Sequence, residues 1–277
     1  MSFKRVLTFQ DLSCVGQCSL GVALPIISAC GHETCALPSA LLSNHTGSSF
    51  SGYTFTDLSA DTTPICEELM RQGVDFDCFY SGYLGSVAQI EYAKAMMNTL
   101  LKKGGVRVVD PAMADHGRLY AGFDMHYAEK MRELCALADI VIPNITEAAM
   151  MSGIEYREDF DREYVEKILD TLCDLGMKCI VLTGVSFDKE TLGVAVRENG
   201  KTEYYFHERL GYLCHGTGDI YASAFVGSYL NQKTCIEAAS IAARFTLASI
   251  LATEDRDTHT YGVRFERAIP SLIEELK

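Results

Sequence analysis

Residues 213–225 read LCHGTGDIYASAF, and this stretch joins a Gly-Thr-Gly loop to a helical pattern of apolar residues. An acidic residue, Asp219, stands where the helix is expected to begin. Helix N-termini attract negative charge, so a capping role alone would explain Asp219. Gly216 and Gly218, however, leave backbone amides uncovered at the same helix start, as in an anion-binding site. The stretch therefore leaves two alternatives, a helix cap or an acid placed beside an anion cradle.

Around this stretch, short apolar runs alternate with helical patterns. The runs that we expect to form strands lie in Arg5–Phe9, Thr34–Pro38, the first part of Asp77–Ser86, Val106–Pro111, Asp139–Asn144 and Lys178–Gly184. Helical patterns lie between them, at about Cys18–Cys30, Asp57–Gln72, Val87–Lys102, Met125–Ala136, Thr146–Met151 and Arg162–Gly176, and cover most of the chain after Asp219. This alternation predicts an α/β fold with a mainly parallel sheet and helices on both faces. Asn199-Gly200 adds an antiparallel hairpin at one edge.

Composition limits the class of protein. The chain has 277 residues, 48% of them hydrophobic, which is enough for one α/β domain over residues 1–277. No apolar run reaches the roughly 18 residues of a membrane span, and the first residues, MSFKRVLTFQ, do not resemble a signal peptide. We therefore expect a soluble cytoplasmic protein with no membrane partner. The net charge of −13 argues against a nucleic-acid partner.

The 11 cysteines are scattered, and no Cys-x-x-Cys occurs among them. In a long chain without a signal peptide, this pattern favours small core residues over disulfides or a zinc site.

Chemistry-capable residues follow most of the predicted strands. In chain order they are Gln10 and Asp11, Ser43 to Thr46, Tyr83, Asp110, Asn144 and Glu147, Thr183 and Gly184, and finally Asp219 in its loop. Ligands of open α/β sheets bind beyond the carboxyl ends of the strands. If the sheet is parallel, these residues converge on one rim, which is a stronger signal than any one of them alone.

The glycine patterns of the chain exclude two nucleotide-binding motifs. Neither G-x-x-x-x-G-K-[ST] nor a G-x-G-x-x-G after the first strand is present. The HGTGD loop instead suits the charge that develops on a phosphoryl group in transfer, and Asp219 beside it can take a proton from an attacking hydroxyl. Asp110 and Glu147 offer oxygen ligands for Mg²⁺. A turn carboxylate at Asp110, and a cap by Thr146 supported by Glu147, are the alternatives.

Other reactive side chains lie close to these motifs. His45 is a possible base, although a histidine in a loop is more often a polar surface residue. His215 flanks the Gly-Thr-Gly loop and is best explained by loop geometry. A structural role is also favoured for Cys214 over reversible addition to an aldehyde substrate.

Five segments occur in a family-specific order: SNHTG, SGYLGS, DPAMADHGRLY, PNITEA and HGTGD. With them the chain resembles the pyridoxal kinase branch of the ribokinase-like superfamily over essentially its whole length. The Gly-x-Gly-Asp loop is common to the superfamily, whereas SNHTG, SGYLGS and the DPxM segment are more specific. The resemblance implies a three-layer α/β/α sandwich, usually dimeric, that transfers the γ-phosphate of ATP to the 5′-hydroxyl of a vitamin B6 vitamer.

The resemblance also implies roles for individual residues. Asp219 matches the general base of the family. The anion hole of the family is matched by Gly216, Thr217 and Gly218. Asp110 and Glu147 match acids near Mg²⁺ and the phosphates. Asn144, Thr183 and Gly184 match the nucleotide site, and Thr46, Gly47 and Tyr83 match contacts to the pyridine ring. The resemblance does not decide whether a monovalent cation is required or which vitamer is preferred.

The chain departs from the family at Asp11, where many of these kinases have a Ser that contacts the ring nitrogen. A carboxylate prefers a protonated ring nitrogen or another donor. The alternatives are a kinase for hydroxymethylpyrimidine or another small alcohol, and a catalytically silent regulator that binds a vitamer or nucleotide. The intact Asp219 beside an intact Gly-Thr-Gly argues against the regulator. It also argues against a second kinase branch, which has Cys in place of the base.

Overall fold

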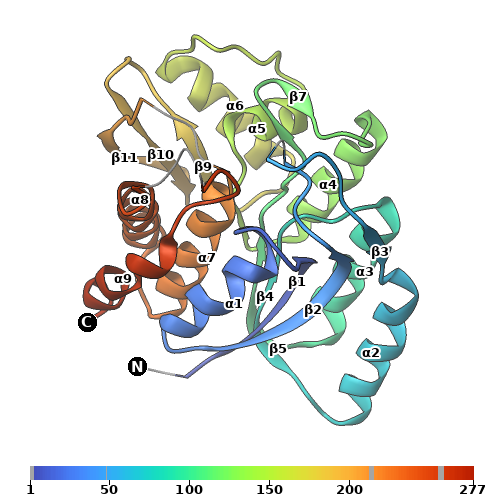
Figure 1. Ribbon diagram of the computed structural model, residues 1–277. Helices are drawn as coiled ribbons and strands as arrows, with labels where there is room; N and C mark the ends of the chain where they lie inside the picture. The colour runs from blue at the N-terminus through green and yellow to red at the C-terminus, as the bar shows by residue number, and fades with distance from the viewer. Residues whose placement is uncertain (1–2, 48, 212–214, 255–258) are drawn as a thin grey trace.

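The computed structural model describes residues 3–47, 49–211, 215–254 and 259–277, and a nine-stranded sheet runs through this part of the chain (Figure 1). Its spatial order is β11-β10-β9-β8-β5-β4-β1-β2-β3. In chain order the strands are β1 (Arg5–Ser13), β2 (Glu33–Leu42), β3 (Phe55–Asp57), β4 (Phe76–Ser81), β5 (Leu101–Val109), β8 (Ile140–Val141), β9 (Cys179–Val185), β10 (Thr191–Glu198) and β11 (Lys201–Glu208). A separate small hairpin pairs β6 (Ala114–Asp115) with β7 (Arg118–Leu119).

The six strands from β9 to β2 are parallel, and the remaining pairings are antiparallel. The β10–β11 hairpin turns at Asn199-Gly200, where both residues have positive φ as such a turn requires. The predicted mainly parallel sheet with an antiparallel edge hairpin is therefore confirmed. Because the parallel strands end on the same side, their following loops meet at one rim.

Helices cover both faces of the sheet, which confirms the three-layer α/β/α sandwich (Figure 1). One apolar core contains buried residues of α2 (Ser59–Arg71), α3 (Val87–Thr99), α4 (Met125–Leu137), α5 (Ile145–Ser152) and α6 (Arg162–Asp174). The core on the other face contains residues of α1 (Leu20–Ala29), α7 (Thr217–Leu230), α8 (Cys235–Leu251), the 3₁₀ turn η1 (Phe265–Arg267) and α9 (Ile269–Glu275).

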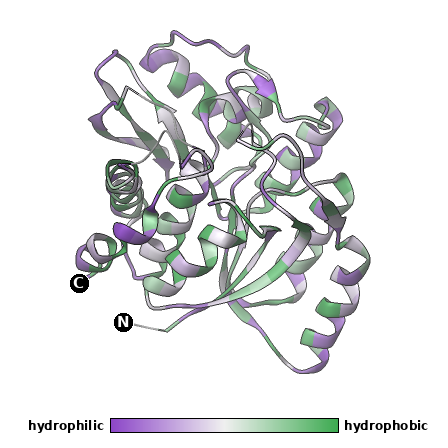
Figure 2. Ribbon diagram, viewed as in Figure 1, coloured by the Kyte–Doolittle hydropathy of each residue, from purple (hydrophilic) through white to green (hydrophobic). Residues whose placement is uncertain are grey.

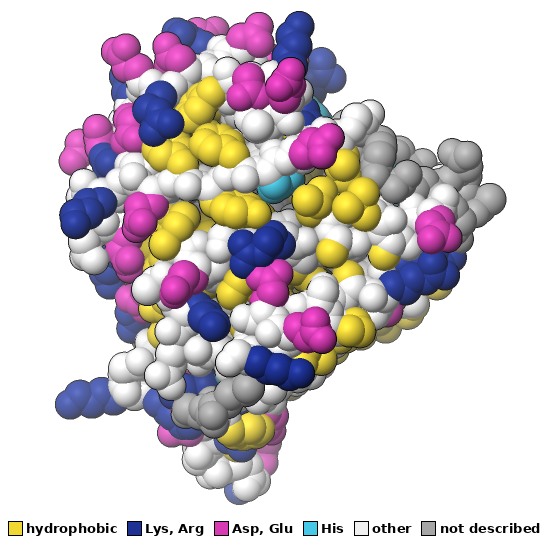
Figure 3. Space-filling model, turned by 90° about the vertical axis from the view of Figure 1, so that its left-hand side faces the viewer, with side chains coloured by type: hydrophobic (Ala, Val, Ile, Leu, Met, Phe, Trp, Pro, Cys, Tyr) yellow, Lys and Arg dark blue, Asp and Glu magenta, His cyan; other side chains and the backbone are white. Residues whose placement is uncertain are grey.

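Hydropathy follows this layering. Apolar residues concentrate in the strands and the helices that pack on them, and hydrophilic residues concentrate in the outer loops (Figure 2). On the face beside α8 and α9, acidic and basic side chains are interspersed among apolar ones (Figure 3). None of the helices in the described part of the chain has the length and apolar character to cross a membrane.

The helix α7 is buried on nearly all sides, because it packs against both α1 and α8. Its residues are small or apolar from Ile220 onward, including Ala222, Ala224 and Gly227, which lets neighbouring helices approach closely. A Cβ at Gly227 would lie 2.4 Å from Sγ of Cys30, so no larger residue fits there without a shift. A helix held this tightly gives the Gly-Thr-Gly loop at its N-terminus a fixed position.

Several element boundaries differ from the sequence-based prediction. β1 continues beyond Phe9 to Ser13 through an irregularity near Asp11, so Asp11 lies inside the strand instead of after it. Similarly, β2 continues beyond Pro38 to Leu42, and Thr183 and Gly184 lie within β9. Pairing with neighbouring strands extends each of these segments beyond its local apolar run.

The edge strand β3 and the small β6–β7 hairpin were not predicted. Residues 55–57 form β3 against β2, and α2 begins only at Ser59. The carboxylate of Asp57 accepts hydrogen bonds from both the backbone N–H and the hydroxyl of Ser59, so it turns the chain between the two elements. Strands of two or three residues carry too little periodicity to be seen in a sequence.

The start of α8 is fixed by a capping box. Thr234 Oγ1 accepts a hydrogen bond from Glu237 N at 3.4 Å, and Glu237 Oε2 accepts one from Thr234 N at 2.8 Å. Two amides that would lack partners at the helix end are thereby satisfied. The cap holds the first turn of α8 beside the start of β9 and the end of β10.

Replacing the cap residue should measurably destabilise the fold. We expect Thr234→Ala to lower the free energy of unfolding by about 1 kcal/mol, the usual cost of a lost N-cap, measured by urea denaturation. The matched control is Thr246→Ala in the same helix, whose hydroxyl only bonds back to the Ala242 carbonyl. The control should change stability by less than about 0.5 kcal/mol. Equal losses in both variants would show that the cap contributes nothing specific.

Candidate active site

The loop before α7 has a geometry that requires glycine at its first position. Gly216 has a φ of 76°, and a Cβ there would lie 1.9 Å from the carbonyl oxygen of Gln17. A Cβ at Gly218 would meet no described protein atom within 4 Å. The backbone at Gly218 is thus open on its outer side, and the amides of Thr217 and Gly218 lie at the positive end of a 14-residue helix.

Asp219 is the third residue of α7, and the N-cap position belongs to Gly216. Its carboxylate accepts a hydrogen bond from the backbone N–H of Ser19, which belongs to a different segment of the chain. Burial, with a smaller contribution from the charge of Asp11, raises the pKa of Asp219 to about 7. A carboxylate with this pKa can exchange a proton near neutral pH, which an ordinary capping Asp does not do.

Ser19 links two acidic side chains and was not identified from the sequence. Its backbone N–H donates to Asp219, and its side chain hydrogen-bonds to Asp11. Ser19 is buried and has a φ of 48° and a ψ of −131°, a conformation that costs energy for a residue other than glycine. A serine at the expected start of a helix is easily taken for a simple N-cap, but here its side chain caps no helix amide.

Asp11 lies in β1, and only 5% of its surface is exposed. Ser13 Oγ donates a hydrogen bond to Asp11 Oδ2 at 3.3 Å, and burial raises the pKa of Asp11. The negative charge of Asp11 also contributes, after burial, to raising the pKa of Tyr83 to about 12. Asp11 therefore lies within electrostatic reach of both Tyr83 and Asp219.

The loop after β2 meets the loop before α7. The rings of His45 and His215 lie 5.9 Å apart. Gly47 N donates a hydrogen bond to His45 Nδ1 at 2.9 Å, and a Cβ at Gly47 would lie 2.6 Å from the same ring. Thr46 is exposed between them. Thr46 and Gly47 thus lie beside the Gly-Thr-Gly loop.

His45 is more deeply buried than a surface histidine. Burial, and then the neighbouring His215, lower its pKa, so the ring is neutral at pH 7. Its Nε2 atom is buried and has no hydrogen-bond partner among the described residues. His45 Nε2 is therefore a buried polar atom at this edge of the site whose hydrogen-bonding capacity the described residues do not use. Cys214 lies outside the described residues.

Asp110 and Glu147 are buried side by side at the ends of β5 and β8. Asp110 Oδ1 accepts a hydrogen bond from Ala112 N, whereas Glu147 accepts hydrogen bonds from Met113 N, Ala114 N and Asn144 N. Burial, then the charges of Glu147 and Asp219, raise the pKa of Asp110, and burial raises the pKa of Glu147 to about 7. Asp110 is therefore electrostatically linked to Asp219 as well as to Glu147.

Asn144, Thr183 and Gly184 lie next to these acids. Asn144 caps α5 through a hydrogen bond from Glu147 N, and its side-chain amide donates to Ala114 O at 2.8 Å. Asn144 and Thr183 pair across the gap between β8 and β9. Gly184 is exposed and has a φ of 77°. These three residues therefore form one surface beside the acids.

Tyr80 lies beneath the site and was also missed by the sequence analysis. Its side chain is fully buried, and after burial the charges of Asp110 and Asp219 raise its pKa. The residue lies inside β4, where an aromatic side chain is indistinguishable in sequence from any other core residue. Tyr80 thus fills the space below the two acids.

Comparisons with known proteins place the chain in a family. A family model described as phosphomethylpyrimidine kinase matches residues 39–263. A pyridoxal kinase of Dictyostelium discoideum is 24% identical over 250 residues, covering 83% of this chain and 80% of that protein. These matches cover most of the site-forming segments described above.

Two solved structures resemble the whole chain. A putative phosphomethylpyrimidine kinase from Bacteroides thetaiotaomicron, crystallised with pyridoxal, is 32% identical, with a TM-score of 0.91 and coverage of 97% of this chain and 95% of that one. Pyridoxal kinase from Lactobacillus plantarum is 30% identical, with a TM-score of 0.89 and coverage of 98% and 97%. The chain therefore belongs to the phosphomethylpyrimidine kinase family and is an ATP-dependent small-molecule kinase of the ribokinase-like superfamily.

Proposed function

We propose that this kinase transfers the γ-phosphate of ATP to the 5′-hydroxyl of a vitamin B6 vitamer. The observation that carries the proposal is the position of Asp219, whose carboxylate has a pKa of about 7 and which directly follows Gly218 at the N-terminus of α7, where a side chain would meet no described atom within 4 Å. A proton acceptor and an anion cradle are the two elements that phosphoryl transfer to an alcohol requires. The similarity to pyridoxal kinases, and to a structure determined with pyridoxal, supports a B6 vitamer as the alcohol.

In this mechanism the vitamer lies between the loop after β2 and Tyr83, and its 5′-hydroxyl points to Asp219. Asp219 accepts the hydroxyl proton as the oxygen attacks the γ-phosphorus. The amides of Gly216, Thr217 and Gly218 hold the negative charge that develops on the transferred group. Asn144, Thr183 and Gly184 line the nucleotide. The site draws on segments from Asp11 to Asp219, which supports one kinase domain over residues 1–277.

The acidic pair fits a divalent cation, and the two carboxylates would serve it differently. Both oxygens of Glu147 already accept backbone hydrogen bonds, whereas Asp110 uses only Oδ1 in the contacts described above. Asp110 would therefore hold Mg²⁺ more directly, and Glu147 would shape the loop that presents it. When bound, Mg²⁺ would neutralise charge on the ATP phosphates. No lysine or arginine stands at the predicted strand-end positions to do so.

Hydroxymethylpyrimidine is the second candidate substrate. The family description and a hydroxymethylpyrimidine/phosphomethylpyrimidine kinase from Aquifex aeolicus, 28% identical over 174 residues, favour it. An ADP-release assay with pyridoxal, pyridoxamine, pyridoxine and hydroxymethylpyrimidine tests the proposal. Preference for hydroxymethylpyrimidine would overturn the B6 assignment, and no turnover of any of the four would favour a silent regulator. Cytoplasmic location and a homodimer stay predictions.

Replacing the proposed base should remove turnover without removing nucleotide binding. We expect Asp219→Asn to lower kcat by roughly a hundredfold or more, the usual scale for a positioned base, while ATP binding measured by calorimetry stays close to wild type. In the wild type, Asp219 is protonated below a pKa of about 7, so kcat/KM should fall as the pH drops through this value.

The residual activity of Asp219→Asn should lack this acidic limb. The control is Asp174→Asn, an exposed carboxylate on α6, which should leave both kcat and the pH profile unchanged. If a folded Asp219→Asn protein turned over substrate as fast as the wild type, Asp219 would have only a structural role at the start of the helix.

Activity should depend on a divalent cation, and Asp110 should set the concentration required. We expect no turnover in excess chelator, and recovery on adding Mg²⁺. Asp110→Ala should raise the Mg²⁺ concentration for half-maximal activity by at least about tenfold. Full activity of the wild type in chelator would contradict this part of the proposal.

The charge of Asp11 should influence the choice of vitamer. A carboxylate favours a positively charged substrate, so kcat/KM should be higher for pyridoxamine relative to pyridoxal than in a protein without this charge. Asp11→Ser should shift the ratio of kcat/KM values toward pyridoxal by about tenfold, equivalent to roughly 1.4 kcal/mol. The ratio is measured for both proteins at one pH. Ser13→Ala, which removes a partner of Asp11 but keeps its charge, is the control. An unchanged ratio in Asp11→Ser would mean that Asp11 does not contribute to the choice between the two vitamers.

A further inference from the structure

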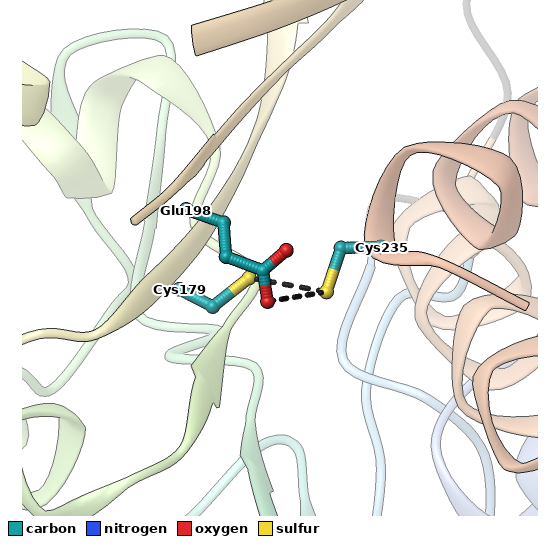
Figure 4. Close-up of side chains that lie close together, drawn as sticks. All are labelled: Cys179, Glu198 and Cys235. Atoms are coloured by element: carbon teal, nitrogen blue, oxygen red, sulfur yellow. Dashed lines mark hydrogen bonds between the residues drawn. The ribbon is translucent and has the colours of Figure 1, made fainter. Parts of the chain in front are cut away.

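Three side chains with metal-binding atoms meet at the end of the sheet away from the proposed active site: Cys179, Glu198 and Cys235 (Figure 4). Cys179 is the first residue of β9, whose other end carries Thr183 and Gly184. Glu198 is the last residue of β10, and Cys235 is the first residue of α8. The proposed kinase reaction uses none of the three, so the cluster calls for a separate explanation.

Two of the three distances between the ligand atoms are close to those around a tetrahedral ion. The two Sγ atoms lie 3.4 Å apart, and Cys235 Sγ lies 3.5 Å from Glu198 Oε1. Around zinc, with bonds of about 2.3 Å to sulfur and 2.0 Å to oxygen, tetrahedral angles separate two sulfurs by about 3.8 Å and a sulfur from an oxygen by about 3.5 Å. The two sulfur atoms therefore need to separate by only about 0.4 Å, and the three ligand atoms already lie within 4.8 Å of one another.

A disulfide between the two cysteines demands a larger change. Its bond length of about 2.0 Å would require the sulfur atoms to approach by about 1.4 Å. Both cysteines are buried, with exposed fractions of 4% for Cys179 and 3% for Cys235, and they sit on a central-sheet strand and a capped helix. A disulfide would also leave Glu198 without a role. The geometry therefore favours a bound ion over a disulfide.

We propose that Cys179, Cys235 and Glu198 form a binding site for a thiophilic divalent cation, with Zn²⁺ as the best fit. Two thiolates and one carboxylate supply three of the four positions of a tetrahedral site, and the fourth opens toward solvent beside the exposed Glu198. Binding replaces the two S–H protons, which leave to water, by two metal–sulfur bonds, and no electron is transferred. The ion would tie together β9, β10 and the start of α8.

The spacing of these ligands explains why no zinc motif is visible in the sequence. Cys179 and Cys235 are 56 residues apart, and Glu198 precedes Cys235 by 37 residues. Known zinc motifs are read from cysteines two to four residues apart. Here the fold brings the ligands together. The sequence-based expectation that most cysteines are small core residues is compatible with this exception.

Cobalt is the direct probe, because tetrahedral Co²⁺–thiolate sites absorb in the visible and near-ultraviolet. The full-length protein, reduced and freed of metal by chelator, is titrated with Co²⁺ and then with Zn²⁺. We expect one equivalent of Co²⁺ to give a thiolate charge-transfer band and intense visible bands, all displaced by Zn²⁺. Glu198→Gln should weaken Co²⁺ binding by at least about tenfold, and Cys235→Ser should abolish the bands.

Controls separate this site from the other cysteines. Cys14→Ser, which removes an exposed thiol elsewhere, and Cys78→Ser, which removes a buried one, should leave the bands unchanged. A hundredfold excess of free Zn²⁺ over its Kd should raise the Tm of the wild type by about 5 °C but not that of Cys235→Ser. Since Glu198 is exposed, Glu198→Gln tests the site even if a cysteine variant fails to fold. Kinase activity should change little in Glu198→Gln.

Three results would overturn the proposal. The first is that the reduced wild type shows no thiolate–cobalt bands. The second is that the bands persist in Cys235→Ser, and the third is that Glu198→Gln binds Co²⁺ as tightly as the wild type. A Cys179–Cys235 cross-link found by peptide mapping after treatment with diamide, in a protein that binds no Co²⁺, would assign the pair to thiol oxidation instead. The test does not depend on the kinase substrate.

Discussion

The proposed active site depends on the hydrogen bonds that the buried carboxylate of Glu147 accepts from the backbone. One oxygen accepts hydrogen bonds from Met113 N and Ala114 N, and the other accepts one from Asn144 N. The loop after β5 and the start of α5 are thereby fixed to a single side chain. Removing it would leave buried amides without partners, at a cost of about 1–3 kcal/mol each. Asp110 and Asn144 keep their positions because this carboxylate does not move.

The helix α7 provides the second fixed point. Its N-terminus carries the Gly-Thr-Gly loop and Asp219, and its body is enclosed by α1 and α8. A rigid, preorganised cradle stabilises developing charge without having to rearrange during the reaction. The loops that would receive the substrate pack on this support through the contact between His45 and His215. The part expected to do the chemistry is thus rigid, and substrate selection falls to the loops around it.

The sequence predicted the fold class and the direction of most strands, because apolar periodicity is a local signal. It could not predict what depends on tertiary packing. The extension of β1 around Asp11, the bridging role of Ser19 and the buried position of Tyr80 arise from contacts between distant segments. The same holds for Glu147. Its place among the acids near Mg²⁺ was predicted from the sequence, but its hydrogen bonds to the backbone amides of Met113, Ala114 and Asn144 were not.

Ser19 has a consequence for the order of events at the site. Its backbone and side chain connect Asp219 and Asp11, and the charge of Asp11 helps to keep Asp219 protonated in the free protein. A bound ring that donates a hydrogen bond or a positive charge to Asp11 would cancel part of that repulsion and lower the pKa of Asp219. A larger fraction of the Asp219 carboxylates would then be ready to accept a proton when the correct alcohol is in place. Such an arrangement would favour transfer to the alcohol over hydrolysis of ATP in the empty enzyme, without any moving lid.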